Sequence, residues 1–406
     1  MGIVFWLSAL PAIVIVLVAL DTLVGERQLD DLRRVTPLEA GPTVSVIVAA
    51  RNEAAGIEHA LTSLLALDYP QLELIVVNDR STDQTGAVLG RLTRRHPKLT
   101  VVTVETLPPG WLGKNHALAL GASRARGEVL LFTDADIVFE PSIVGRAVRL
   151  MEQQSLDHLT SIPNFVARGV PLTTLVLAFG VLFTFYTRPW KARDPKSRHH
   201  IGIGAFNMVR RTAYERLGTH AAIALRVDDD LRLGRAVKAS GLRQNVAIAA
   251  ELLTVEWYPS VRAMIDGLMK NAFAGVHYSV VLVVLSTLAM LGLYVWPWVA
   301  LGMTSGAARA MAAVAVVGMS AIVFRHARGA GRSPFYVLTF PLGVLGFVYI
   351  LWRSAALALV RGSINWRGTS YPLADLRRAT PAPILSPGTS RPDNREGFSV
   401  HATTMS

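Results

Sequence analysis

Glu128-Val-Leu-Leu-Phe-Thr133, followed at once by Asp134-Ala-Asp136, joins a short apolar run to two acidic residues. The run has the length and composition of a buried strand. Two carboxylates that lie two residues apart just past a strand end can converge on one hard cation, such as Mg²⁺ or Mn²⁺. Taken alone, Asp134 and Asp136 also suit a solvated turn, so the rest of the chain has to distinguish the two interpretations.

The chain around this stretch alternates short apolar runs with helical patterns. The predicted strands lie at 44–50, 72–78, 99–104 and 128–133, and the predicted helices at 56–67, 82–96, 115–125 and 141–153. Strands and helices that alternate with short links predict an α/β fold, a parallel sheet covered by helices. Ligands of such sheets bind beyond the carboxyl ends of the strands, where Asp134 and Asp136 are expected.

Polar residues also follow the first two predicted strands. Arg51-Asn-Glu53 comes after the first strand and suits either a nucleotide pocket or a surface ion pair. Asp79 follows the second strand and can accept hydrogen bonds from a base or a ribose. Further along, Asp228-Asp229-Asp230 is a run of like charges, which is useful where a cation compensates it or where a raised pKa serves a general base. An acidic helix N-terminus is the alternative interpretation of this run.

The order of these segments resembles glycosyltransferase family 2, which has a GT-A fold. The segments, in chain order, are Arg51-Asn-Glu53, Asp68-Tyr-Pro70, Val77-Asn-Asp79, Gly113-Lys114, the predicted strand followed by Asp134-Ala-Asp136, and Asp229-Asp230 with Leu233-Gly-Arg235. The resemblance covers about residues 43–260. It implies a GT-A domain, here joined to transmembrane helices, that uses a UDP- or GDP-sugar and Mg²⁺ or Mn²⁺.

The resemblance also implies a role for each site residue. Asp136 would ligate the metal, with Asp134 as a second ligand or as a contact of the ribose or diphosphate. Asp230 would be the catalytic base, and Asp229 is the alternative because a run of three aspartates allows the register to slip by one. Asp79 would contact the nucleotide base. The implied donor-binding residues are Arg51, Glu53, Asp79, Lys114 and Asp134.

The chain departs from the family in three places. Ala50 stands where a proline is usual, and Asp229 stands where a glutamate is usual. The Gln-x-x-Arg-Trp pattern of processive synthases does not follow the predicted base, which favours transfer of a single sugar. Arg262 and Lys270 are then candidates for binding the leaving diphosphate, with interfacial snorkelling as the alternative.

The composition indicates a membrane protein. The 406 residues are 51% hydrophobic and 17% charged, against roughly a quarter charged in soluble proteins. Apolar runs at 3–24, 278–302, 307–324 and 335–358 are long enough to span a bilayer or nearly so. The shorter run from Leu172 to Tyr186 predicts an interfacial helix or the wall of an acceptor channel, with a core helix as the alternative. The absence of cysteine excludes disulfides and thiolate metal sites.

The net charge of +12 fits a positive-inside membrane protein, and no nucleic-acid readout module is present. Arginines after the first apolar run place the following domain in the cytoplasm. Three later spans would place the C-terminal tail outside, yet the tail is rich in arginine, and a re-entrant or interfacial last segment would resolve this conflict. The segment from Trp366 to Tyr371 would either return to the mouth of the active site or anchor at the membrane interface.

The sequence thus predicts four parts: an anchor at 1–26, a cytoplasmic GT-A domain at 27–277, about three membrane helices at 278–360, and a basic interfacial segment with a disordered tail at 361–406. The predicted function is inverting transfer of one sugar to a lipid acceptor by a multi-pass protein of the cytoplasmic membrane. A processive polysaccharide synthase and a non-catalytic donor-binding subunit are the alternatives.

Overall fold

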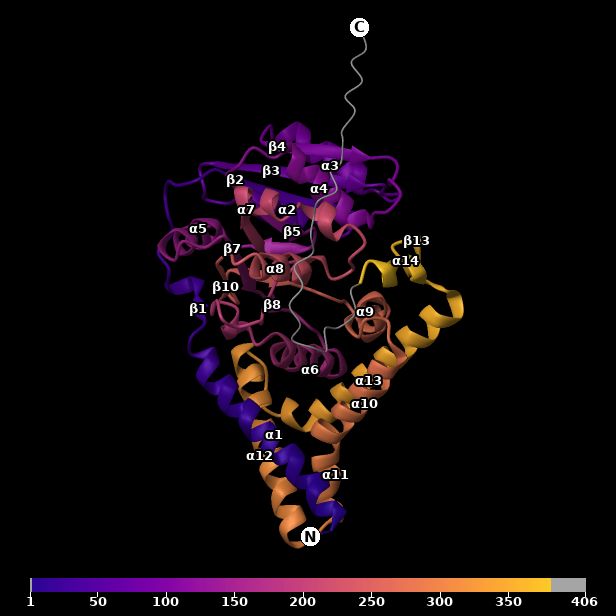
Figure 1. Cartoon of the computed structure of the whole chain (residues 1–406). Helices are drawn as coiled ribbons and strands as arrows, with labels where there is room; N and C mark the ends of the chain where they lie inside the picture. The colour runs from indigo at the N-terminus through magenta and orange to yellow at the C-terminus, as the bar shows by residue number, and fades with distance from the viewer. Residues whose placement is uncertain (1, 381–406) are drawn as a thin grey trace.

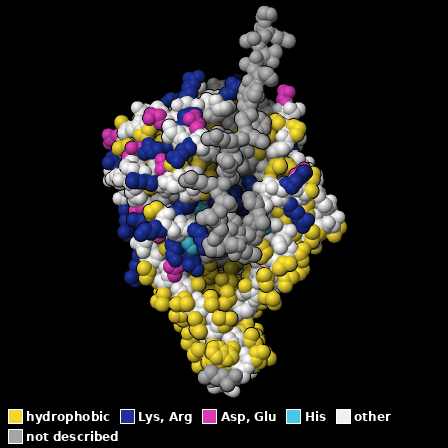
Figure 2. Space-filling model, in the orientation of Figure 1, with side chains coloured by type: hydrophobic (Ala, Val, Ile, Leu, Met, Phe, Trp, Pro, Cys, Tyr) yellow, Lys and Arg dark blue, Asp and Glu magenta, His cyan; other side chains and the backbone are white. Residues whose placement is uncertain are grey.

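The computed structural model describes residues 2–380, which form an α/β domain on a wedge of long apolar helices (Figure 1). The helices converge at the end that holds the N-terminus, opposite the α/β domain. In the view of Figure 2, basic side chains gather over the α/β domain, whereas the surface of the wedge is mainly hydrophobic. The two halves therefore present surfaces suited to different solvents.

An eight-stranded sheet forms the centre of the α/β domain. Its strands in spatial order are β1 (Asp30–Asp31), β10 (Gln244–Ile248), β7 (His158–Ile162), β9 (Asn207–Arg210), β5 (Val129–Asp134), β2 (Val44–Ala50), β3 (Leu72–Asp79) and β4 (Leu99–Val104). All neighbours pair in parallel except β9, which is antiparallel to both β5 and β7. The predicted α/β fold with a mostly parallel sheet is confirmed.

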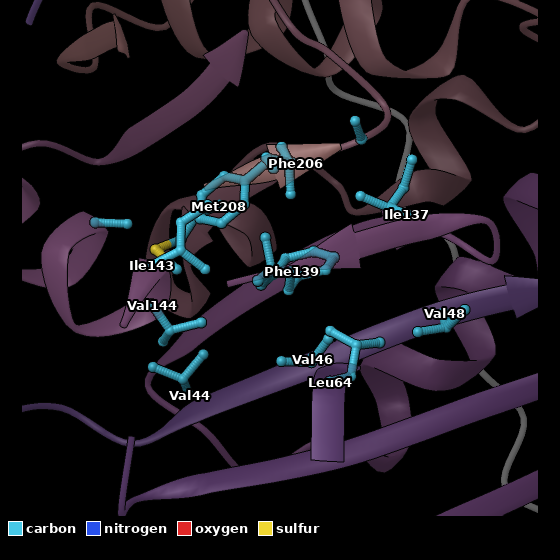
Figure 3. Packing of buried hydrophobic residues seen from close by; sticks show 14 of the residues in the cluster. Val44, Val46, Val48, Leu64, Ile137, Phe139, Ile143, Val144, Phe206 and Met208 are labelled. Carbon is cyan, nitrogen blue, oxygen red and sulfur yellow. The ribbon is translucent and has the colours of Figure 1, made fainter. Parts of the chain in front are cut away.

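Helices cover both faces of this sheet because its central strands are apolar on both sides. Val46 and Val48 pack toward the face of α2, α3 and α5, while Ile47 packs toward α4, α7 and α8. Figure 3 shows the first of these two layers, with β2 side chains against Leu64 and Val144. The helices are α2 (Ile57–Leu65), α3 (Thr85–Arg95), α4 (Gly113–Arg124), α5 (Ile143–Gln153), α7 (Arg211–Arg216) and α8 (Asp229–Ala239).

Two small sheets and several short helices complete the domain. A three-stranded sheet joins β6 (Ile137–Phe139), β11 (Leu253–Val255) and β8 (Asn164–Phe165), and a hairpin joins β12 (Ser363–Trp366) to β13 (Thr369–Pro372). The remaining helices of this part are η1 (Leu32–Arg34), η2 (Pro189–Lys191), η3 (His220–Ile223), α9 (Val261–Gly275) and α14 (Leu373–Arg378).

The apolar helices pack against one another through a shared core. They are α1 (Ile3–Glu26), α6 (Val170–Thr187), α10 (Val280–Met290) with η4 (Leu291–Val295) and α11 (Trp296–Met303), α12 (Gly306–Gly329) and α13 (Tyr336–Arg361). Ile15 of α1, Val181 of α6, Met319 of α12 and Val344 of α13 are all buried in one cluster. Among residues 2–380, five segments are long and apolar enough to cross a membrane by length and composition, and the run at 170–191 is one of them.

The positions of α6 and α13 bear on two questions that the sequence leaves open. α6 lies across the base of the α/β domain, and α13 passes beneath that domain instead of reaching the narrow end of the wedge (Figure 1). Residues 362–380, which follow α13, therefore lie on the side of the α/β domain. The predicted disordered tail falls on residues 381–406, which lie outside the described residues.

Candidate active site

A cavity of about 700 Å³ lies at the carboxyl ends of β2, β3 and β5. These parallel strands end side by side, and so the polar residues that follow them meet there. Every predicted site residue lines this cavity: Arg51, Glu53, Asp79, Lys114, Asp134, Asp136, Asp229 and Asp230. Segments up to about 180 residues apart in the sequence are thus brought to one place.

Lys114 lies between the two acidic clusters. Its Nζ is 2.9 Å from an Oδ of Asp134 and 3.3 Å from an Oδ of Asp229. Burial lowers the pKa of the Lys114 amine, but Asp134 and Asp229 outweigh burial, so the net shift is upward. The ammonium charge therefore holds the end of β5 and the start of α8 together.

Asp136 has a different environment from Asp134. Burial raises the pKa of Asp136 to about 7, and the neighbouring carboxylates of Asp134 and Glu53 add to the shift. Lys114 instead lowers the pKa of Asp134 against the effect of burial. Asp136 is thus a carboxylate among carboxylates, a position in which a bound cation would relieve the repulsion.

The run of three aspartates divides into three environments. Asp228 pairs with Arg226 and Arg232, at 2.9 and 2.8 Å. Asp229 pairs with Lys114, whereas Asp230 accepts a hydrogen bond from the backbone N–H of Gly204 at 2.9 Å. Burial and the charge of Asp229 raise the pKa of Asp230 to about 7. Of the two predicted bases, Asp230 is the one without a basic partner at ion-pair distance among residues 2–380.

Glycine is required where the loop before β9 passes the start of α8. A Cβ on Gly202 would lie 1.9 Å from the carbonyl oxygen of Asp230, and one on Gly204 would lie 2.7 Å from Asp134. The close approach lets the Gly204 N–H reach Asp230. Gly202 and Gly204 thus lie between the two acidic clusters.

Asp79 is held by two arginines. Arg80 Nε is 2.7 Å from Asp79 and Arg51 is 3.6 Å from it, and only 3% of Asp79 is exposed. A Cβ on Gly113 would lie 2.3 Å from the Asp79 carboxylate. The sequence predicts that Asp79 and Arg51 lie in the pocket, but it does not predict the Arg80–Asp79 pair, since adjacent charged residues carry no such signal.

A family model adds an independent observation. The model described as glycosyl transferase family 2 matches residues 45–218, a range that includes Arg51, Asp79, Lys114 and the Asp134-Ala-Asp136 segment. Over this range the chain is similar to glycosyl transferase family 2. The protein is accordingly a glycosyltransferase.

Curated relatives resemble the glycosyltransferase over most of its length. A 4,4'-diaponeurosporenoate glycosyltransferase of Staphylococcus aureus is 22% identical over 91% of this chain and 99% of its own length. The enzyme of the same description from Staphylococcus haemolyticus is 24% identical over 58% of this chain and 63% of its own. A solved mannosyltransferase from Pyrobaculum calidifontis, in complex with GDP-Man and Mn²⁺, is 21% identical over 87% of this chain and 99% of its own, with a TM-score of 0.46.

The far wall of the glycosyltransferase cavity is aromatic. The rings of Phe179 and Trp257 lie 4.5 Å apart between centroids, and Phe165 and Phe183 extend this wall on either side. Phe179 and Phe183 belong to α6, so the cavity reaches from the acidic clusters to an apolar helix. This position agrees with the prediction that 172–186 forms the wall of an acceptor channel. The helix itself is longer than predicted and extends from Val170 to Thr187.

The sequence predicts only part of the contribution that Lys270 and the β12–β13 hairpin make to the cavity. Lys270 lines the cavity, whereas Arg262 is 93% exposed and pairs with Asp266, so the two candidates for the diphosphate differ in position. Trp366, Arg367 and Tyr371 of the β12–β13 hairpin also line the cavity. The segment after the last apolar run thus returns to the mouth of the site, one of the two predicted alternatives.

Proposed function

We propose that this glycosyltransferase transfers one sugar from a UDP- or GDP-sugar to a hydroxyl group of a membrane lipid, with inversion at C1. The observation that carries the proposal is the single cavity, which joins the acidic clusters to the aromatic wall of α6. A charged, hydrophilic donor suits the acidic and basic end, and a hydrophobic acceptor suits the aromatic end.

The donor end fits a divalent cation held partly by the substrate. Within residues 2–380, no three His, Cys, Asp or Glu side chains converge as a preformed metal centre. Mg²⁺ is commonly bound by one or two carboxylates together with substrate phosphates, and the crowded Asp136 carboxylate offers such a ligand. Asp136, with Asp134 as second ligand, would hold Mg²⁺ or Mn²⁺. When bound, the cation would neutralise charge on the leaving diphosphate.

Other protein groups at the donor end would bind and orient the nucleotide-sugar. Asp79 would accept hydrogen bonds from the nucleoside, held in place by Arg51 and Arg80. Lys114 would orient the ends of β5 and α8 and face the diphosphate from the protein side. These contacts position C1 of the sugar without covalent chemistry.

Asp230 would act as the general base. The acceptor oxygen attacks C1 while its proton passes to an Oδ of Asp230, and the bond from C1 to the diphosphate oxygen breaks, so the diphosphate leaves with the electron pair. No enzyme nucleophile intervenes, and a single in-line displacement inverts the configuration. The hydrogen bond from Gly204 to Asp230 would orient the carboxylate for this step.

A lipid acceptor is supported by two further observations. The relatives act on 4,4'-diaponeurosporenoate, according to their description, and this chain resembles the Staphylococcus aureus enzyme along nearly its whole length. The aromatic wall is continuous with α6, which packs on the membrane-type helices α12 and α13. We propose the anchor at 1–26, the catalytic domain at 27–277 facing the cytoplasm, the helices at 278–360 in the cytoplasmic membrane, and the basic segment from 361 on the domain side.

The aromatic wall provides a first prediction. Phe179→Asp should raise the KM for the lipid acceptor at least tenfold, because it places a charge in an apolar wall, and it should leave donor affinity unchanged. Phe179→Leu keeps the wall apolar and is the matched control. Steady-state kinetics with the acceptor varied in mixed micelles would measure the acceptor KM of both variants. An equal loss of donor affinity in Phe179→Asp would contradict the assignment of Phe179 to the acceptor end of the cavity.

The pKa of Asp230 predicts the pH dependence. Since burial and Asp229 raise that pKa to about 7, the base carries its proton below pH 7 and is free above it. At saturating Mn²⁺, kcat/KM should rise about tenfold per pH unit below pH 7 and level off above it. A rate that is flat or falls between pH 6 and 8 would rule out Asp230 as a base with this pKa.

The proposed function itself is tested with purified protein in liposomes that contain the membrane lipids of its host. Radiolabelled UDP- and GDP-sugars should yield one discrete labelled lipid after organic extraction and chromatography. A ladder of products would support the processive synthase instead. Donor binding without any labelled product would support a non-catalytic subunit.

A further inference from the structure

The hairpin of β12 and β13 follows α13 and folds back onto the donor end of the cavity. Its strands pair in antiparallel register, with Ile364 opposite Tyr371 and Trp366 opposite Thr369. The tip consists of Arg367 and Gly368. A segment about 300 residues after Arg51 and Glu53 in the sequence thereby becomes part of the same site.

Four contacts, made by Trp366, Arg367 and Tyr371, fix the hairpin there. Arg367 pairs with Glu53 at 2.5 Å and also donates a hydrogen bond to the carbonyl oxygen of Arg51. The Tyr371 hydroxyl accepts a hydrogen bond from the Gly113 N–H at 3.3 Å, next to Lys114. Lys270 Nζ lies 4.1 Å from the ring centroid of Trp366. The hairpin therefore contacts three segments at the donor end: the loop after β2, the start of α4, and α9.

The conformation of the tip does not favour arginine. Arg367 and Gly368 have φ values of 45° and 78°, as in a two-residue hairpin loop with positive φ at both positions. Asn or Asp followed by Gly is strongly preferred in such loops, because a β-carbon is strained in this region. An arginine kept in this conformation at a site points to a function of its side chain.

Most other cations of the cavity are already engaged. Arg51 and Arg80 hold Asp79, Lys114 holds Asp134 and Asp229, and Arg232 holds Asp228. Arg367 differs because it reaches in from a separate segment and its side chain is more exposed than those of the other four cations. Its side chain is 42% exposed, so it has room to move.

We infer that Arg367 is a donor-binding residue, which leaves Glu53 and forms a paired hydrogen-bonded contact with the donor diphosphate. This inference rests on the proposed function, since it requires a nucleoside diphosphate at the donor end. A guanidinium matches phosphate oxygens with two parallel hydrogen bonds, and a diphosphate offers more negative charge than one carboxylate. Lys270, beside Trp366, would be the second cation on this side of the diphosphate.

The test uses the full-length protein in detergent, with Arg367→Asn as the main variant. Asparagine suits the positive φ of this position. The thermal unfolding midpoint of the variant should therefore equal or exceed that of the wild type. We expect the Kd for UDP or GDP, measured with Mn²⁺ by calorimetry, to rise about ten- to hundredfold, the effect of losing hydrogen bonds to a charged group. Arg367→Lys, which keeps the charge, should recover part of the affinity.

Arg378→Asn is the matched control, because Arg378 is 80% exposed and pairs only with Asp375 among the described residues. It should bind UDP or GDP as the wild type does. UMP and GMP, which lack the β-phosphate, distinguish a phosphate contact from a structural role. Arg367→Asn should weaken diphosphate binding more than monophosphate binding.

Each outcome decides one question. If wild type binds UDP or GDP and Arg367→Asn binds it equally well, or loses monophosphate and diphosphate affinity in the same proportion, the inference is wrong and the proposed function stands. If wild type binds neither nucleotide, the donor end has been misassigned and the proposed function fails first. A lower donor affinity with an unchanged acceptor KM supports the inference.

Discussion

Asp230→Asn is expected to lower kcat for sugar transfer by about 10³-fold while the Kd for the donor changes less than about twofold. The amide keeps the shape of the side chain and can still accept the hydrogen bond from Gly204, but it cannot take the acceptor proton. Rapid-quench kinetics at saturating donor and acceptor measure kcat, and calorimetry with UDP and GDP measures donor binding.

Two variants make this result specific. Asp68→Asn changes an exposed aspartate at the opposite end of β3 and should leave kcat unchanged. Asp229→Asn removes a partner of Lys114 and should act mainly on the donor KM, because we propose that this lysine faces the diphosphate. Should Asp229→Asn abolish kcat while Asp230→Asn keeps it, the register of the base would shift by one residue.

Removal of the divalent cation is expected to lower transfer more than a hundredfold, and added Mn²⁺ or Mg²⁺ should restore it. The expectation follows from Asp136, whose pKa is raised to about 7 by burial and by neighbouring carboxylates that a cation would compensate. Asp136→Ala should show the same loss, and Mn²⁺ should fail to restore it. Activity assays after chelation, together with donor binding in the presence and absence of Mn²⁺, measure both effects.

The control for the cation is again a distant aspartate. Asp68→Ala should lose activity on chelation and regain it with Mn²⁺, as the wild type does. Full transfer by the wild type after exhaustive chelation would contradict a metal role for Asp136 and Asp134. Lys114, Lys270 and Arg367 would then have to stabilise the leaving diphosphate without a metal ion.

Four neighbouring strands of the central sheet, β2 to β5, could be predicted because their signal is local. The bounds of β2 and β4 agree with the predicted strands at 44–50 and 99–104, since each strand is a short apolar run between polar links. Asp79, Asp134 and Asp136 could be predicted for the same reason, whereas Asp229 and Asp230 begin α8 and were identified through the family resemblance. Residues that follow neighbouring parallel strands must meet at one edge of the sheet, whatever the details of packing.

The contacts between distant segments could not be predicted in this way. Nothing in the sequence near Lys114 indicates that it bridges Asp134 and Asp229, because that bridge depends on how α4, β5 and α8 pack. The topology of the tail also required the structure. Hydropathy identified 335–358 as a span, but it does not reveal that α13 passes beneath the α/β domain and delivers Arg367 to Glu53.

The most direct measurement of the central claim is lipid profiling by mass spectrometry in a strain that lacks this protein. A glycolipid should disappear and a precursor lighter by one sugar should accumulate. Re-expression of the wild type should restore the glycolipid, whereas Asp230→Asn, at equal protein level, should not. An unchanged lipid profile, or restoration by Asp230→Asn, would contradict transfer of one sugar to a lipid by this site.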